Sequence, residues 1–253
     1  MNSSSILYKV EGRLATITLN RPHRKNALDQ EALDLLVERI DQSYEDDNVW
    51  LVLIDASGAD FCTGQDVKQL VTDGNTGDYF EPVYNSLKRN YKPVICLVRG
   101  LCLAGGAGIA MGADIRVFSD TARLGWPHAK IGICSIGGPS TLARSVPVNI
   151  ALEYMFTGDY MGAERAKELN IANHVFPDSD LERKSQDIIN SILANAPLST
   201  RAAKRATLST LSLPYSDAVA KAHAILDELM CSEDAQEGMR AFSEKRKPNW
   251  KGR

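Results

Sequence analysis

The hydrophobic pattern of the first two thirds of the chain alternates between strand-like and helix-like segments. The stretch ILYKVEGRLATITLNRP predicts a β-hairpin, because two short alternating runs flank Glu11 and Gly12 and the second run stops at Pro22. A helix is expected after Asp29, which is a good N-cap residue. Its apolar positions follow the helical spacing: Leu33, Leu36, Val37 and Ile40.

Two further runs, WLVLIDA and PVICLVRG, are almost continuously apolar. Such runs are typical of strands that are covered on both faces, and each is followed by a glycine-containing loop and then a helical pattern. The repeated order of strand, loop and helix predicts an α/β fold.

The pattern changes after Pro147, where the β signal nearly ends. Apolar positions at helical spacing predict one amphipathic helix: Leu181, Ile188, Ile189 and Ile192. Alanine-rich segments between Pro197 and Phe242 predict more helices, and EKRKPNWKGR forms a basic end. With no low-complexity linker, we divide the chain into a core (1–195) and a helical region (196–253) that packs on the core as one unit.

Composition narrows the class of ligand. A chain of 253 residues with 44% hydrophobic residues can bury a sizeable core, and a net charge of −3 gives no basic surface for nucleic acid. The apolar runs are too short for a membrane helix, and the start of the chain does not resemble a secretory signal. The five cysteines show no CxxC spacing and the four histidines are scattered. We therefore expect a cytoplasmic protein with reduced thiols and a small-molecule ligand, without partners among nucleic acids or membranes and without a metal site.

Two junctions between a strand and a loop carry the candidate chemistry. In WLVLIDASGADFCTGQDVKQL the loop passes through Gly64, and a helix is expected to begin near Gln65 and Asp66. In GLCLAGGAGIAMGAD a helix is expected to begin near Gly105. Glycine costs roughly 0.5–1 kcal/mol in a helix relative to alanine, so the glycine-rich second segment indicates that something lies very close to its backbone.

Both junctions would point backbone N–H groups at one place, since adjacent parallel strands end at the same edge of a sheet. Two such donors aimed at one oxygen form an oxyanion hole. Taken singly, each loop is better explained by a tight turn, whereas the two together, each behind a core strand, favour a functional role. A dinucleotide fingerprint is excluded because Met111 stands where the third glycine belongs, and a serine-hydrolase elbow because Ile133 stands two residues before Ser135.

Five segments together resemble the enoyl-CoA hydratase/isomerase (crotonase) family, in order and over essentially the whole chain: NRPHRKNAL, DFCTGQD, GLCLAGGAGIAMGADIRV, TGDYMGAERAKELNIANHVFP and EGMRAFSEKRKPNW. The resemblance implies a spiral of ββα units with a helical C-terminal trimerisation region, assembled as a homotrimer or as a homohexamer built from two trimers. It also implies an acyl-CoA thioester as ligand, with coenzyme A as part of the substrate and no further cofactor.

The resemblance assigns the oxyanion donors to the backbone N–H groups of Gln65 and Gly105. It also exposes a departure, because the positions where hydratases of the family carry two glutamates are Gly108 and His128, and a position where some members carry aspartate is Ile136. We therefore expect Gly108 to open room in an apolar pocket, which favours a branched, cyclic or aromatic acyl group. His128 is either a proton carrier or a space-filling histidine beside Trp126, with equal weight.

The resemblance further implies substrate contacts from the first loop and the C-terminus. Candidate binding residues are Lys25, Ala27, Thr63, Asp66, Lys68, Gly108, Ile136 and Lys245, the last reaching a neighbouring subunit. Asp66 is better explained by helix capping. Most lysines are merely solvated, but for Lys25 and Lys245 the match to the family's motifs favours contact. The segment with Tyr79, Phe80, Glu81 and Tyr84 is expected to line the acyl pocket, where Glu81 either replaces a lost acid or lies on a surface helix.

Three functions are compatible with these residues and with the resemblance to the family. The favoured one is an enzyme that stabilises a thioester enolate and acts as an enoyl-CoA isomerase or an atypical hydratase or lyase. The second is an acyl-CoA hydrolase or decarboxylase on the same fold, since loss of CO₂ leaves an enolate without a strong base. The third is a non-catalytic protein that binds CoA esters.

Overall fold

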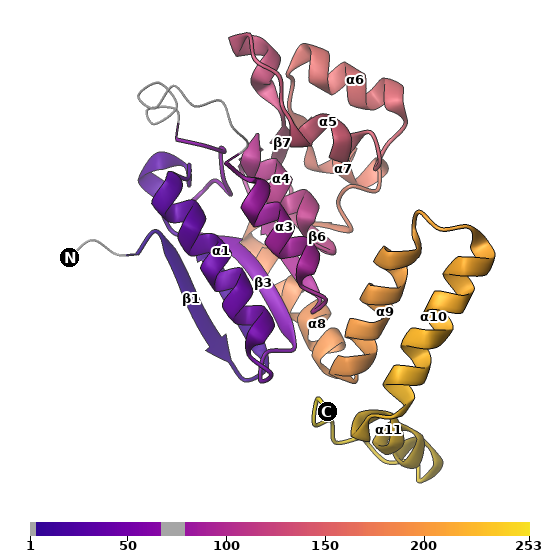
Figure 1. Ribbon diagram of the computed structural model, residues 1–253. Helices are drawn as coiled ribbons and strands as arrows, with labels where there is room; N and C mark the ends of the chain where they lie inside the picture. Colours follow the sequence, from indigo (N-terminus) through magenta and orange to yellow (C-terminus); the bar gives the residue numbers. More distant parts are fainter. Residues whose placement is uncertain (1–3, 67–78) are drawn as a thin grey trace.

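A six-stranded sheet forms the centre of the computed structural model, which describes residues 4–66 and 79–253 (Figure 1). In spatial order its strands are β1 (Ile6–Glu11), β2 (Leu14–Leu19), β3 (Leu51–Ala56), β4 (Val94–Val98), β6 (Ile115–Ser119) and β9 (His174–Phe176). β1 is antiparallel to β2, and all the other pairs are parallel. A second sheet holds β5 (Leu101–Leu103), β7 (Arg123–Gly125) and β8 (Met161–Gly162).

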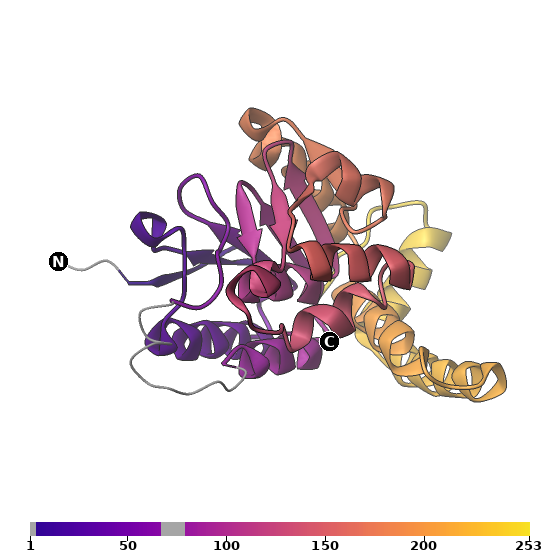
Figure 2. The same ribbon diagram turned by 90° about the horizontal axis from the view of Figure 1, so that it is seen from above.

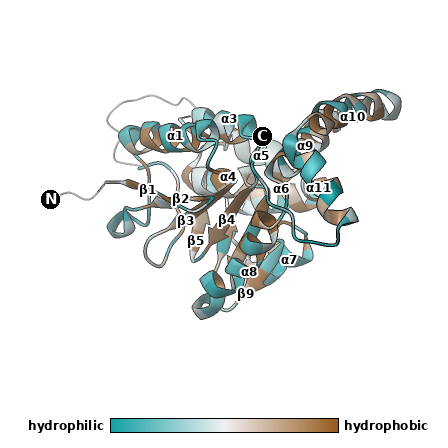
Figure 3. Ribbon diagram, turned by 90° about the horizontal axis from the view of Figure 1, so that it is seen from below, coloured by the Kyte–Doolittle hydropathy of each residue, from teal (hydrophilic) through white to brown (hydrophobic). Residues whose placement is uncertain are grey.

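Helices cover both faces of the large sheet. Figure 3 shows α1 (Gln30–Glu45) and α3 (Glu81–Arg89) on one face and α8 (Leu181–Leu193) on the other. Alternate residues of β3 and β4 therefore belong to two separate cores, with Val52 facing α1 and Leu53 facing α8. This confirms that the continuous apolar runs are strands buried on both sides.

The remaining helical elements follow in chain order. They are η1 (Pro22–Arg24), α4 (Gly105–Gly112), η2 (Pro127–Ile131), α5 (Gly137–Leu142), α6 (Val148–Thr157), α7 (Ala163–Glu168), η3 (Asp178–Asp180), α9 (Pro197–Thr210), α10 (Tyr215–Met230) and α11 (Glu233–Ser243).

The N-terminal elements match the sequence prediction. β1 and β2 form the hairpin, and Gly12 at its turn has a φ of 59°, in the left-handed region. The Asp29 side chain caps α1 by accepting a hydrogen bond of 3.0 Å from the Ala32 backbone N–H. Gln65 forms a parallel bridge with Leu28. The body of the helix expected to begin near Gln65 and Asp66 lies outside the described residues, so that helix stays a prediction.

The helical C-terminal region is present, and its elements contact the core to different extents. α9 is anchored, since the Lys204 ammonium lies 2.7 Å from the Asp114 carboxylate and Arg201 donates to the Val49 carbonyl. α10 packs on α9, and the pair projects away from the body of the molecule (Figures 1 and 2). Exposed apolar side chains follow this pair: Leu208, Leu211, Leu213, Tyr215, Val219, Leu226 and Met230. The division at residue 195 stays a prediction.

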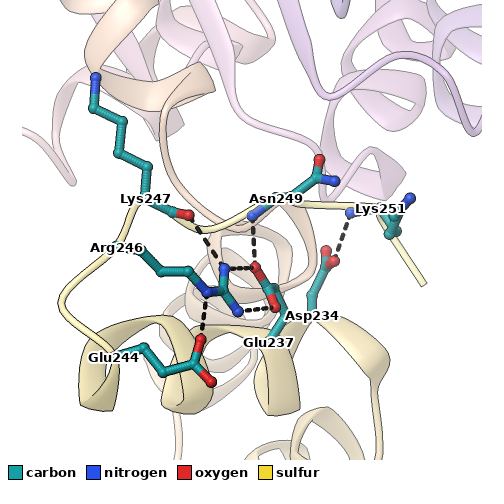
Figure 4. Close-up of polar contacts among 7 residues, drawn as sticks. All are labelled: Asp234, Glu237, Glu244, Arg246, Lys247, Asn249 and Lys251. Carbon is teal, nitrogen blue, oxygen red and sulfur yellow. Dashed lines mark hydrogen bonds and ion pairs between the residues drawn. The ribbon is translucent and has the colours of Figure 1, made fainter.

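The last residues of the chain are tied back to α11 (Figure 4). Arg246 makes a two-pronged ion pair with Glu237, at 2.6 and 2.9 Å, and this hydrogen bonding lowers the pKa of Glu237 to about 2. The buried Asp234 carboxylate accepts hydrogen bonds from the backbone N–H groups of Lys251, at 2.6 Å, and Gly252, at 2.9 Å. The tail is therefore a fixed part of the fold.

Replacing Asp234 by alanine is expected to lower the free energy of unfolding by about 1–3 kcal/mol, because two backbone N–H groups lose their acceptor. The measurement is chemical denaturation followed by circular dichroism. Asp227→Ala, at an exposed position of α10, is the control and should change stability little. Equal stability of the two variants would contradict the anchoring role of Asp234.

Candidate functional site

The loops that follow β3 and β4 meet at one edge of the large sheet. Their backbones pair directly, since the Cys62 N–H donates to the Leu101 carbonyl at 3.0 Å and the Leu103 N–H donates to the Cys62 carbonyl at 2.8 Å. Further along both loops, a Cβ placed on Gly64 would lie 2.8 Å from the Ala104 Cβ and 3.2 Å from the Gly105 nitrogen. The two glycine junctions singled out in the sequence are thus in van der Waals contact.

Two backbone N–H groups at this contact have no backbone acceptor among the described residues. In the bridge between Leu28 and Gln65, the Leu28 N–H donates to the Gly64 carbonyl and the Asp66 N–H donates to the Leu28 carbonyl, each at 2.9 Å. The Gln65 N–H takes no part in this bridge. Gly105 is the first residue of α4, where N–H groups have no partner within the helix. Within residues 4–66 and 79–253, no backbone oxygen accepts from either N–H.

The backbone before Gly105 is held in an uncommon conformation. Ala104 has φ 52° and ψ −119°, outside the regions that a residue with a side chain prefers. Its N–H donates to the Gly125 carbonyl at 2.9 Å, so the pairing of β5 with β7 fixes the direction in which the Gly105 N–H points. Strain of this kind persists only where the surroundings impose it, and it is frequent at functional sites.

The glycines of α4 make room for side chains of α3. A Cβ on Gly108 would overlap the Tyr84 hydroxyl, and one on Gly112 would lie 2.8 Å from Leu87 Cδ1. A Cβ on Gly105 would likewise overlap the ring of Phe80, the residue before α3. Something does lie very close to this backbone, as the sequence indicates, but it is the protein's own side chains. The expected open room beside Gly108 is wrong, because Tyr84 fills it.

Tyr84 is half-buried between two glycine-containing helices. Its hydroxyl lies 3.4 Å from the Gly105 carbonyl oxygen, and its ring is stacked against that of Phe80 with the centroids 6.1 Å apart. A Cβ on Gly137 of α5 would lie 3.3 Å from the ring edge. The sequence marks Tyr84 only as a pocket residue. Two helical faces could have indicated this packing. Phe80, Tyr84 and Leu87 follow one another at helical spacing, and so do Gly105, Gly108 and Gly112.

His128 lies in η2, three residues after Gly125. It is half-buried, and burial lowers the pKa of its imidazole against an opposing hydrogen bond with the Trp126 backbone. Its Nδ1 is buried and, among the described residues, has no hydrogen-bond partner. Burial therefore favours the neutral imidazole, which is the form that accepts a proton. Ile136, in contrast, is 61% exposed and does not wall an enclosed pocket.

The predicted binding residues of the first loop gather around one another. The exposed Lys25 offers its carbonyl to the Thr63 N–H at 3.2 Å, and the Ala27 carbonyl accepts from Arg21 at 2.6 Å. Arg21 also lies 3.6 Å from the Asp66 carboxylate. Arg21, which the sequence does not single out, thus links Ala27 to Asp66, the residue that follows Gln65.

The other candidates are not brought to this site within one chain. Lys245 follows α11, which lies at the opposite end of the molecule from η1 (Figures 1 and 2). Glu81 is exposed at the start of α3, consistent with a surface helix. Lys68 lies outside the described residues.

Neither a metal cluster nor a membrane helix is found in the part of the chain that the structure describes. No group of three or more histidine, cysteine, aspartate or glutamate residues could hold a metal ion there. No helix of that part combines the length and apolarity needed to cross a bilayer.

Comparison with known proteins gives matches over nearly the full length. The family model described as enoyl-CoA hydratase/isomerase matches residues 9–253. The chain is 32% identical to enoyl-CoA hydratase EchA19 of Mycobacterium tuberculosis, covering 98% of this chain and 96% of that one. It is 29% identical to (E)-benzylidenesuccinyl-CoA hydratase of Thauera aromatica, covering 98% and 99%. The crystal structure of an enoyl-CoA hydratase/isomerase from Mycobacterium paratuberculosis superimposes with a TM-score of 0.92 at 33% identity, covering 99% of both chains.

Proposed function

Because the chain belongs to the enoyl-CoA hydratase/isomerase family and is therefore an acyl-CoA-processing enzyme, we propose that it stabilises a thioester enolate between the backbone N–H groups of Gln65 and Gly105. The observation that carries this proposal is the contact of the two loops at Gly64, beside two N–H groups that no described backbone oxygen uses. An enolate concentrates its charge on the thioester oxygen. Removing one preorganised donor of this kind typically costs about 3–4 kcal/mol of activation free energy.

We propose double-bond isomerisation or an atypical hydration or lyase reaction as the chemistry. The resemblance to the family places glutamates at positions that here are Gly108 and His128, so a two-glutamate mechanism is not available. His128 follows Gly125, whose carbonyl holds Ala104, by three residues, and burial lowers the pKa of its imidazole. We therefore propose His128 as the base. Coenzyme A arrives as part of the substrate, and we propose no further cofactor.

A second candidate is decarboxylation or thioester hydrolysis on the same site. It is favoured by the absence of a carboxylate at Gly108 and Ile136, since loss of CO₂ generates the enolate without a strong base. The third candidate, a non-catalytic protein that binds CoA esters, predicts intact affinity without turnover.

Residues of the first loop and of the C-terminal segment would bind the coenzyme A moiety of the substrate. Lys25, Thr63, Asp66 and Lys68 would contact the coenzyme A moiety from one chain, with Ala27 beside them. Lys245 would reach the same moiety from a neighbouring copy. A homotrimer or a homohexamer in the cytoplasm supplies that copy, and the exposed apolar side chains on α9 and α10 support such an assembly.

If His128 is the base, kcat/KM should be constant from pH 8 to about pH 6.5 and fall only below the ordinary imidazole pKa of about 6.5. The sign follows from burial, which lowers the pKa, so the active neutral form persists to lower pH and is lost as pH falls through the folded value. The measurement is a pH profile of the wild type and of His128→Gln. An unchanged acidic limb in His128→Gln would contradict this role.

The proposed function is tested by a mass-spectrometric screen. The purified protein and its His128→Ala variant are incubated with enoyl-, malonyl- and aryl-CoA esters in deuterated water. Product formation or deuterium incorporation supports the enolate enzyme, and its loss in the variant assigns the proton transfer to His128. Binding without product or deuterium would favour the non-catalytic alternative.

A further inference from the structure

We propose that the Tyr84 hydroxyl is the acid that returns a proton to the enolate, in the place left by the missing carboxylate at position 108. This inference rests on the proposed function, since it requires an enolate held at Gly105. It adds a catalytic residue from α3, an element that supplies neither oxyanion donor.

The position of the hydroxyl relative to α4 carries the proposal. Side chains on a helix tilt toward its N-terminus, so the side-chain space at Gly108 lies over the first turn of α4. The Tyr84 hydroxyl occupies that space and lies 3.4 Å from the carbonyl of Gly105. A phenol thus stands beside the residue whose N–H would hold the thioester oxygen.

The phenol is also held in place. Its ring packs against Phe80 on one side and faces Gly137 of α5 on the other. One turn along α3, Leu87 packs against Gly112 and fixes the distance between α3 and α4. Glu81, the other candidate on this helix, is exposed and does not share this position. A rigidly placed acid is what efficient proton transfer requires.

The proposed step protonates the enolate and restores the thioester. The negative charge on the thioester oxygen re-forms the C=O bond, and the electron pair of the enolate C=C bond, or of its conjugated extension, forms a C–H bond at the α or γ carbon. The proton comes from the Tyr84 O–H bond, which breaks to leave a phenolate. The phenolate then takes a proton from the base that opened the reaction or, after decarboxylation, from water.

The test compares Tyr84→Phe with Tyr44→Phe, a matched loss of a hydroxyl at the far end of α1. Phenylalanine keeps the ring that packs on Gly108 and Gly137, so the fold should be retained. Using the acyl-CoA ester that the wild type converts in the screen, we expect kcat to fall at least about 100-fold in Tyr84→Phe, with KM unchanged and Tyr44→Phe unaffected. Equal kcat in the two variants would overturn the role of Tyr84.

A second variant keeps the proposal testable if Tyr84→Phe misfolds. Fluorotyrosine at position 84 lowers the phenol pKa with little change of shape, and the alkaline limb of kcat should move to lower pH. An unmoved limb would overturn the proposal. A wild type that neither binds nor converts any ester of the panel would instead overturn the proposed function itself.

Discussion

Replacing Gly64 by alanine is expected to lower kcat/KM at least about 100-fold, because it disturbs both proposed oxyanion donors at once. Gly64 has a φ of 96°, where a residue with a side chain is strained by about 1–3 kcal/mol. The added Cβ would also lie 2.8 Å from the Ala104 Cβ and 3.2 Å from the Gly105 nitrogen. The measurement is steady-state kinetics on the ester identified by the screen, together with chemical denaturation.

Gly12 offers a matched control for this substitution. It has a φ of 59°, and a Cβ there would meet no atom within 4 Å. Gly12→Ala should therefore cost stability through backbone strain, about 1 kcal/mol or more, and leave kcat/KM unchanged. If both variants lose activity equally, strain alone explains the loss and the contact between the two loops has no special role.

Introducing a glutamate at position 108 is expected to destabilise the protein rather than to create a hydratase. The first atom of the new side chain would overlap the Tyr84 hydroxyl, and overpacking of this kind typically costs about 1–3 kcal/mol. The measurements are chemical denaturation and hydration of crotonyl-CoA. Gly108→Glu alone should lose stability and show no hydration.

Removing the Tyr84 side chain should allow a glutamate at position 108 to act in hydration. In Gly108→Glu combined with Tyr84→Ala the carboxylate has space, and hydration of crotonyl-CoA should then become measurable while Tyr84→Ala alone shows none. A stable Gly108→Glu variant would contradict the placement of Tyr84. A double variant without any hydration would weaken the assignment of position 108 to the acid of the hydratases.

The sequence predicts those features that depend on neighbours close in the chain. The hairpin around Gly12 and the helix capped by Asp29 follow from local rules and are confirmed. The strands β3 and β4 are recognisable because both of their faces are buried, and parallel neighbours must end at one edge. The meeting of the two loops, at Gly64 and Gly105, was therefore predictable.

What the sequence does not predict depends on contacts between distant segments. Glycines on α4 indicate a close neighbour but not which one, and only the packing of α3 identifies Tyr84 as the group beside Gly108. The bridge between Gln65 and Leu28 likewise joins residues far apart in the chain, and no local pattern indicates it. β9 has three half-buried residues, too few to display an alternating pattern.

The most direct test of the central claim is a crystal structure of the protein with a saturated acyl-CoA, which binds without being converted. We predict that the thioester oxygen lies about 2.7–3.1 Å from both the Gln65 and the Gly105 backbone nitrogens. An ordered acyl-CoA whose thioester oxygen contacts neither nitrogen would contradict the claim that these two loops form an oxyanion hole.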